Sequence, residues 1–227
     1  MAPATPKKRA AGNIGRREFL SLSLRSMAGM LAGGGLLGLY IKGEKARSAP
    51  LRPPSALAEE DFLGRCLRCG LCAKDCPYDA IRMATPGGGI VTGTPYIEAR
   101  KIPCYMCEDI PCQKACPSGA LDKGMEHIEQ ARMGLAVLHD QETCLAYLGQ
   151  RCEVCYRACP LLGTAMTIEY KPGENAAYFL PIVHSEACTG CGFCEHVCIL
   201  DKPAIKVFDI ALVKGERGPY YRKEVLR

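Results

Sequence analysis

Apolar residues along the chain come in short runs separated by polar and cysteine-rich segments. The run from 26 to 41 is uncharged but holds five glycines in 16 residues, which is short and weakly apolar for a membrane-spanning helix. The stretches "GLAVLHD" at 134–140 and "FLPIVHS" at 179–185 have the composition and length of strands. Small and aliphatic residues also follow each of four cysteine groups. The pattern predicts a repeated order of strand, cysteine loop, short helix and strand.

Charge separates the first 48 residues from the rest of the chain. They hold nine Lys or Arg and two Glu, net +7, whereas the remainder holds 20 basic and 22 acidic residues, net −2. A slightly acidic domain does not suit a nucleic-acid partner. Arg16 and Arg17, followed by Phe19 and Leu20, resemble a bacterial twin-arginine signal. Residues 1–48 are therefore predicted to be a signal segment, with an ordinary secretory signal as the alternative.

Two places fit the end of this signal. Small residues at 46 and 48 predict cleavage before Ala49, and "ALA" at 56–58 offers a second site before Glu59. The first lies nearer the apolar run and is preferred, while an uncleaved signal acting as a tether stays open. Residues 49–60, which include the Pro-rich "LRPPSA", are predicted to be a linker ahead of a domain at 61–227.

All sixteen cysteines fall into four groups, at 66–77, 104–117, 144–160 and 188–198. The first has the C-x2-C-x2-C-x3-C-P spacing of bacterial ferredoxins, and the fourth repeats it without the proline. Three such thiolates wrap three corners of an iron–sulfur cube, and the fourth is expected to start a helix and bind the other cluster of a pair. The middle groups carry loop insertions but keep the x3-C-P ending.

Other uses of these thiols fit the spacing less well. Covalent haem requires C-x-x-C-H, which is not found in the sequence. Structural zinc normally takes two thiolates from one loop rather than three, and close C-x2-C spacing is poor for disulfides between distant segments. Zinc and disulfides remain as minor alternatives. Sixteen thiolates therefore predict four [4Fe–4S] clusters, with these ligands: Cys66, Cys69, Cys72, Cys76, Cys104, Cys107, Cys112, Cys116, Cys144, Cys152, Cys155, Cys159, Cys188, Cys191, Cys194 and Cys198.

The predicted fold class is α+β, with two bacterial-ferredoxin-like modules that together carry the four cluster-binding repeats after the signal segment. The chain has no Trp and five Phe, so clusters are expected to help fill its interior and to be coupled to folding. Thiols exported unfolded into an oxidising compartment would form disulfides before iron arrived. A twin-arginine signal, which carries folded proteins, fits this requirement and predicts a periplasmic location.

Several stretches beyond the cysteines resemble a known family. They are "LRPP", "CLRCGLCAKDCPYDAI", "GTPYIEARKIPCYMCEDIPC", "CPSGAL", "RMGLAVL", "RCEVCYRACP" and "HSEACTGCGFCEHVC", and together they are similar to the NapG and MauM group of ferredoxin-type proteins, with the greater likeness to NapG. The resemblance covers essentially the whole chain. It implies a periplasmic electron carrier at the membrane face, between a quinol-oxidising partner, NapH, and a c-type cytochrome that serves a periplasmic nitrate reductase.

The resemblance also implies how the ligands pair. Relatives with four such groups usually pair the first with the fourth and the second with the third, although pairing of the first with the second and the third with the fourth stays open. Carried over to this sequence, the four ligand sets are Cys66, Cys69, Cys72 and Cys198; Cys188, Cys191, Cys194 and Cys76; Cys104, Cys107, Cys112 and Cys159; and Cys144, Cys152, Cys155 and Cys116.

The sequence shows no catalytic triad or phosphate loop of its own, so the chain is interpreted as a carrier within a quinol dehydrogenase complex. Two alternatives stay open: MauM-like service to methylamine utilisation, and an iron–sulfur subunit of a molybdenum oxidoreductase. The neighbouring genes would distinguish the first alternative from the favoured function. Stable co-purification with a large catalytic chain would indicate the second.

Overall fold

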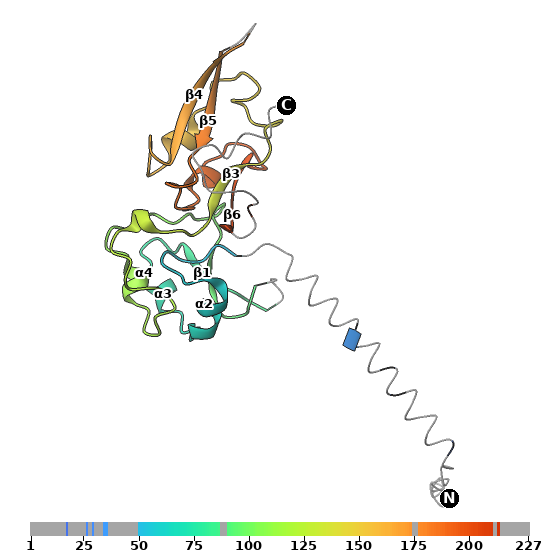
Figure 1. Cartoon of the computed structure of the whole chain (residues 1–227), viewed down its shortest axis with the longest axis vertical. Helices are drawn as coiled ribbons and strands as arrows, with labels where there is room; N and C mark the ends of the chain where they lie inside the picture. Colours follow the sequence, from blue (N-terminus) through green and yellow to red (C-terminus); the bar gives the residue numbers. More distant parts are fainter. Residues whose placement is uncertain are drawn as a thin grey trace, which may run out of the picture. The chain divides into compact units, whose positions relative to one another are not determined.

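The computed structural model describes residues 50–86, 90–173, 177–210 and 213, with five isolated positions before residue 50. The chain divides into two compact units, 1–46 and 47–227. Apart from those five positions, the predicted signal segment lies outside the described residues. All four cysteine groups lie in the second unit (Figure 1). Within the described residues, no helix has the length and apolar character needed to cross a bilayer.

Short helices and paired strands alternate along the second unit (Figure 1). Up to residue 130 the elements are α2 (Glu59–Arg65), α3 (Leu71–Lys74), β1 (Ile81–Met83), β2 (Pro95–Ile97), α4 (Pro111–Lys114) and the 3-10 helix η1 (Ile128–Gln130). They are followed by β3 (Leu135–Leu138), α5 (Val154–Arg157), β4 (Met166–Pro172), β5 (Ala177–Val183), α6 (Phe193–His196) and β6 (Ile205–Phe208). Strands β3 and β5 confirm the two strands predicted at 134–140 and 179–185.

One four-residue helix stands in each cysteine group, and the third cysteine of the group is its second residue. A helix this short is not stable alone, so the surrounding loop must hold it. The expectation that the fourth cysteine starts a helix is wrong, because α3 ends at Lys74 and Cys76 follows it. The first turn of a helix has backbone N–H groups without intrahelical partners. The third thiol therefore lies in the first turn of its helix, where backbone N–H groups are near it.

Strand pairing divides the second unit into two modules. Strand β3 precedes the third cysteine group and pairs antiparallel with β6, which follows the fourth, with Leu135 opposite Phe208. In the same way, an antiparallel bridge between Ala56 and Leu121 encloses the first and second groups. Strands β1 and β2 form a hairpin-like pair within the first module, and β4 and β5 within the second. We call residues 50–122 the N-terminal module and 133–208 the C-terminal module.

The segment predicted as a linker is part of the N-terminal module. Leu51 pairs with Ile97 beside strand β2, the Leu57 N–H donates to the Ala120 carbonyl at 3.2 Å, and Leu51 and Arg52 are both buried. The segment supplies the outer backbone of the module, which is the place that β3 takes in the C-terminal module. The prolines in this segment suggested a linker, but a proline at the edge of a sheet removes no hydrogen bond between strands, so the segment can still join the module.

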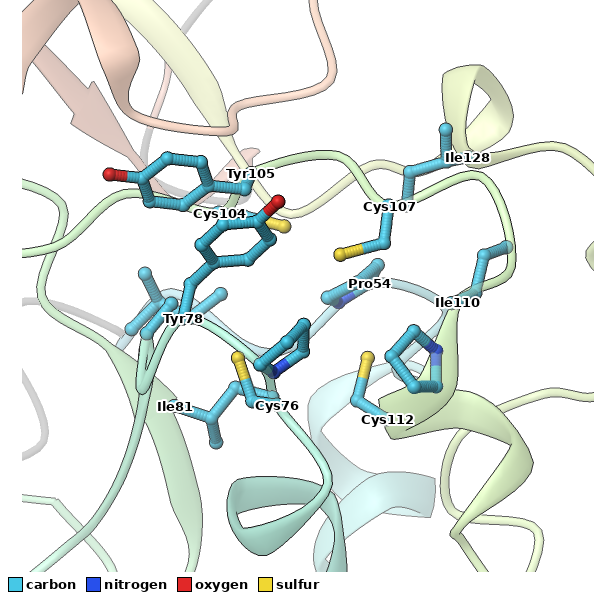
Figure 2. A pocket seen from close by; sticks show the side chains of 14 residues that line it. Pro54, Cys76, Tyr78, Ile81, Cys104, Tyr105, Cys107, Ile110, Cys112 and Ile128 are labelled. Carbon is cyan, nitrogen blue, oxygen red and sulfur yellow. The ribbon is translucent and has the colours of Figure 1, made fainter.

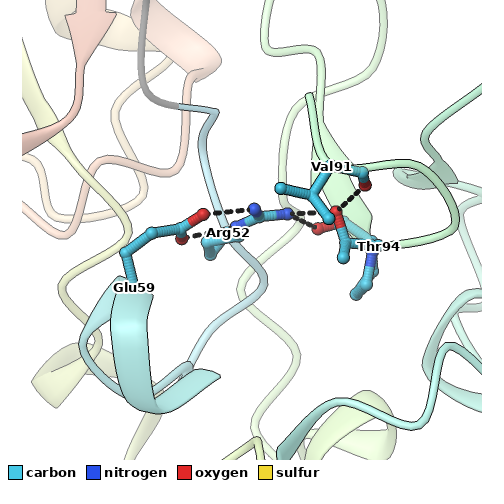
Figure 3. Close-up of polar contacts among 5 residues, drawn as sticks. Arg52, Glu59, Val91 and Thr94 are labelled. Carbon is cyan, nitrogen blue, oxygen red and sulfur yellow. Dashed lines mark hydrogen bonds and ion pairs between the residues drawn. The ribbon is translucent and has the colours of Figure 1, made fainter. Parts of the chain in front are cut away.

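Arg52 ties this segment to the rest of the module (Figure 3). Its guanidinium faces the Glu59 carboxylate through two nitrogens, with Nε–Oε2 at 2.8 Å. Its third nitrogen donates to Thr94 Oγ1 at 3.0 Å and to the Pro95 carbonyl at 2.7 Å. The group also lies 4.8 Å from the centroid of the fully buried Phe62 ring. Groups from helix α2 and from the Thr94–Pro95 segment about 40 residues away thus converge on one buried side chain.

The two modules meet through backbone contacts between the second and fourth cysteine groups. The Cys104 N–H donates to the Cys191 carbonyl at 2.8 Å. Arg100 reaches across from the N-terminal module and donates to the Cys198 and Leu200 carbonyls, each at 2.8 Å. Arg100 therefore binds backbone oxygens beyond the end of α6, where carbonyl groups lack intrahelical partners.

Gly192 makes this close approach possible, and its replacement is expected to loosen the module contact. Gly192 and Gly70 both start the short helix of their group with positive φ, 93° and 75°. A Cβ at 192 would lie 2.5 Å from the Cβ of Ala99, whereas one at 70 would meet nothing within 4 Å.

Gly192→Ala should therefore lower stability by about 1–3 kcal/mol more than the matched Gly70→Ala. Both variants force an alanine into the left-handed region, but only the new methyl group at 192 overlaps another residue. The measurement is the temperature at which each variant, kept under argon, loses the visible absorbance of the expected iron–sulfur clusters. Equal losses in the two variants would contradict the close approach.

Candidate metal centres

All sixteen cysteines are free thiols, and among the described residues no three Cys, His, Asp or Glu converge closely enough for a single metal ion. The thiols instead form four sets of four, each with three cysteines from one group and the fourth from its neighbour. We call them set A (Cys66, Cys69, Cys72 and Cys116), set B (Cys104, Cys107, Cys112 and Cys76), set C (Cys188, Cys191, Cys194 and Cys159) and set D (Cys144, Cys152, Cys155 and Cys198).

Set B surrounds a hollow in the N-terminal module (Figure 2). Its four sulfurs face the same space, which is otherwise lined by apolar groups such as Pro54, Ile81, Ile97, Ile110 and Ile128. The space between the atoms is about 370 Å³, its open mouth included. Four thiols that face one apolar-lined hollow suit the ligand set of an iron–sulfur cluster.

Set C surrounds a second hollow in the C-terminal module. The lining includes all four of its cysteines, together with Leu161, Met166, Phe193 and Val207. The empty space is about 360 Å³, close to that at set B. The two modules therefore carry equivalent thiol-lined hollows, as expected from the repeated fold.

Sets A and D are identified by the mutual effect of their thiols on pKa. The pKa of Cys72 is raised to about 11, mainly by burial, and the charges of Cys66, Cys69 and Cys116 act in the same direction. In set D, burial raises the pKa of Cys144, and the charges of Cys152 and Cys198 act in the same direction. A thiolate feels such repulsion only from close neighbours, so these cysteines lie together.

The structure contradicts the pairing of the first group with the fourth. Cys76 lies with Cys104, Cys107 and Cys112, not with the fourth group, and Cys159 lies with Cys188, Cys191 and Cys194. Cys116 and Cys198 fall in sets A and D in the same manner. The physical reason is the strand pairing, because each module closes around two consecutive groups. The other pairing left open by the sequence is the one that the structure adopts.

The thiols have the surroundings that cluster ligands need. Burial raises the pKa of Cys104, Cys112 and Cys155 to about 12, so without metal these groups stay protonated at neutral pH and must release protons on binding it. Backbone N–H groups partly offset the burial: Ala73 bonds the Cys72 sulfur, and Phe193 bonds the Cys191 sulfur. Such hydrogen bonds favour the charged thiolate form and tune iron–sulfur clusters.

Cys116 differs from the other cysteines whose pKa is shifted. Burial alone would raise its pKa, but hydrogen bonds from the Leu121, Ser118 and Ala120 backbone and from the Ser118 hydroxyl outweigh burial and lower it. The Ser118 Oγ lies 3.6 Å from the Cys116 Sγ. This serine was not identified from the sequence as a functional residue. Its position two residues beyond the fourth cysteine of a group could have indicated a hydroxyl close to a ligand sulfur.

Three aromatic rings link the hollow of set B to the loop of set C. Tyr78 and Tyr105 are stacked at the rim of the set B hollow, with ring centroids 3.9 Å apart (Figure 2). Tyr105 also contacts the edge of Phe193, which lines the set C hollow, at 5.1 Å. The edge contact between Tyr105 and Phe193 is a favourable aromatic geometry. These rings cover the space between the two modules beside the Cys104–Cys191 hydrogen bond.

His196, which lies between two cysteines, is not part of any thiol set. Its side chain is exposed, and its Nδ1 lies 3.0 Å from the Arg100 carbonyl oxygen. The histidine therefore shares in the contact between the modules. Arg100 was likewise not recognised as a functional residue from the sequence, because its partners are backbone oxygens about a hundred residues away.

Comparison with known protein families agrees with this arrangement. The 4Fe-4S dicluster domain matches residues 65–120, which hold the first two cysteine groups. A 4Fe-4S binding domain matches residues 185–198, which hold the fourth. A two-cluster domain over the first two groups fits the N-terminal module with its sets A and B. No solved structure matches the chain.

Curated proteins similar to the chain are ferredoxin-type proteins. The chain is 54% identical to the ferredoxin-type protein NapG of Escherichia coli, over 92% of this chain and 91% of that protein. It is 50% identical to NapG of Haemophilus influenzae, over 95% and 79% respectively. It is also 45% identical to the methylamine utilization ferredoxin-type protein MauM of Methylorubrum extorquens, over 89% and 93%.

Proposed function

Because the chain belongs to the NapG/MauM family of iron–sulfur electron-transfer proteins, we propose that it is a periplasmic carrier with four [4Fe–4S] clusters, one in each thiol set. It takes electrons from a membrane quinol-oxidising partner of the NapH type. It delivers them through a c-type cytochrome to a periplasmic nitrate reductase. The observation that carries the proposal is the gathering of all sixteen free thiols into four sets of four.

The clusters supply one-electron chemistry at potentials that span roughly −700 to +450 mV in proteins. The chain itself holds the thiolates and keeps the sets close together. Electrostatic effects on thiol pKa values cross between the sets in a fixed order: Cys72 raises the pKa of Cys112 between A and B, Cys191 that of Cys104 between B and C, and Cys155 that of Cys194 between C and D. This order supports a linear relay with B and C in the middle and A and D at its ends.

The direct test of this function is cluster content followed by electron delivery. Protein purified without oxygen is expected to hold about sixteen irons and as many sulfides per chain, because each [4Fe–4S] cluster uses four thiolates. Reduction should give the EPR signals of interacting clusters, and the reduced protein should be reoxidised by the c-type cytochrome. Fewer than about twelve irons per chain would overturn the four-cluster proposal, and an inert reduced protein would overturn the relay.

Export is expected to depend on the paired arginines. Arg16→Lys with Arg17→Lys should leave cluster-loaded protein in the cytoplasm, because a twin-arginine signal carries proteins that have already folded. Export that continues unchanged would contradict this proposal.

The mature chain is expected to begin at Ala49 if the signal is cut. Cleavage before Glu59 would detach the buried Leu51 and Arg52 from the module. Mass spectrometry of the exported protein decides between the two sites, and a first residue at Glu59 would overturn the preferred one.

Service to methylamine utilisation is the second candidate function, supported by the 45% identity to MauM. The two functions differ in the pathway that loses activity when the gene is deleted. Loss of quinol-dependent nitrate reduction supports the NapG-like function. Loss of growth on methylamine with nitrate reduction intact supports the MauM-like one.

A further inference from the structure

The Ser118 hydroxyl is positioned toward the sulfur of one cysteine and is held there by the backbone. Its Oγ lies 3.6 Å from the Cys116 Sγ and accepts a hydrogen bond from the Ala120 N–H at 3.4 Å. In a free thiol either atom could donate across the Oγ–Sγ contact. A thiolate bound to iron has no proton to give. With a cluster bound, the hydroxyl must therefore be the donor, and the sulfur the acceptor.

Cys116 collects more hydrogen-bond donors than the corresponding cysteine of the C-terminal module. Its sulfur is bonded by the backbone N–H groups of Ser118, Ala120 and Leu121 and by the Ser118 hydroxyl. Cys159, the fourth cysteine of the third group, is bonded by the Leu161 backbone N–H, and the side chain at that position is aliphatic.

The other two groups also lack a small hydroxyl at this position. Tyr78 follows Cys76 by two residues, but its ring stacks on Tyr105, and Leu200 occupies the matching place after Cys198. A serine hydroxyl at this site is thus particular to set A, which the relay order places at one end of the protein.

We propose that Ser118 is a positioning residue that raises the reduction potential of the cluster held by set A, through a hydrogen bond from its hydroxyl to the Cys116 sulfur. Reduction adds negative charge to a cluster, and a donor at a ligand sulfur stabilises that charge. The set A cluster is therefore easier to reduce than it would be without the serine. The inference rests on the proposed ligand sets and adds to them a residue that shifts the reduction potential at one end of the relay.

The test is an anaerobic redox titration of the full-length protein followed by EPR. In Ser118→Ala, one of the four cluster potentials is expected to move to more negative values while the other three stay in place. We expect a three- to tenfold change in that cluster's reduction equilibrium, where tenfold corresponds to about 59 mV for a one-electron couple. Ser118→Thr keeps the hydroxyl and should restore the original potential.

A reciprocal variant adds the same hydroxyl where the chain lacks it. Leu161→Ser places a hydroxyl two residues beyond Cys159 and should move a different cluster potential, that of set C, to more positive values. Iron and sulfide counts are scored separately, so too few clusters in the unmodified protein would refute the proposed cofactor content rather than the role of Ser118.

Three results would overturn the role of Ser118. They are four unchanged potentials in a fully loaded Ser118→Ala, a Ser118→Thr that shifts as far as Ser118→Ala, and a Leu161→Ser with no positive shift. If Ser118→Ala fails to assemble its cluster, the Leu161→Ser variant decides the question alone.

Discussion

Replacing Cys76 with serine is expected to remove one of the four proposed clusters, the one that set B holds, and to leave about twelve irons per chain. Cys76 comes from the first cysteine group, yet the structure places it with Cys104, Cys107 and Cys112 around one hollow. A [4Fe–4S] cluster needs four thiolates, so three remaining cysteines hold it poorly. The measurement is iron and sulfide per chain after anaerobic purification.

Double variants show which cysteines share a cluster. Cys76→Ser combined with Cys112→Ser should lose no more iron than either single variant, because both residues serve set B. Cys76→Ser combined with Cys194→Ser should lose a second cluster and leave about eight irons, because Cys194 belongs to set C. If the first group paired with the fourth, these two outcomes would be exchanged. The experiment therefore separates the two pairings even when each single variant loses iron.

Arg52→Ala is expected to destabilise the N-terminal module by about 3 kcal/mol, because a nearly buried guanidinium loses its partners on two segments at once. The Arg52 side chain is only 7% exposed, whereas that of Glu59 is 41% exposed and can regain water. Thr94 and the Pro95 carbonyl lose a charged donor. A 3 kcal/mol change lowers the midpoint of a module of about 60–100 residues by about 12–24 °C.

The controls for Arg52 separate its charge from its shape. Arg52→Lys keeps the charge but loses the two-nitrogen contact with Glu59 and the packing over Phe62, so it should recover only part of the stability. Lys101→Ala breaks the exposed pair with Glu98 and should change stability by less than about 0.5 kcal/mol. The readout is thermal loss of cluster absorbance at a fixed scan rate. An Arg52→Ala variant as stable as the parent would contradict this role.

The strands and the cysteine chemistry could be predicted because their signals are local. The short apolar runs at 134–140 and 179–185 indicated β3 and β5 correctly, and C-x2-C spacing restricts which metal groups a short loop can wrap. The proline-rich segment before residue 59 was misread, because burial of Leu51 and Arg52 depends on residues 40 or more positions away. Sequence composition cannot report such a partner.

Ser118 and Arg100 show the same limit at the metal centres. A serine beside a cysteine group is unremarkable in sequence, and only the turn that brings its hydroxyl to 3.6 Å from a sulfur gives it a role. Arg100 acts on carbonyl groups, which every residue has, so no side-chain pattern marks its targets.

The sequence by itself determined which atoms bind metal in this proposal, because sixteen cysteines in four ferredoxin-type groups leave few other uses for their thiols. Only the tertiary structure decided how the thiols are shared among the four sets. The spacing alone would allow each fourth cysteine to join the three cysteines of the group before it or of the group after it. The choice is made by β3 pairing with β6 and by Ala56 pairing with Leu121, since backbone hydrogen bonds between distant segments close each module around two consecutive groups.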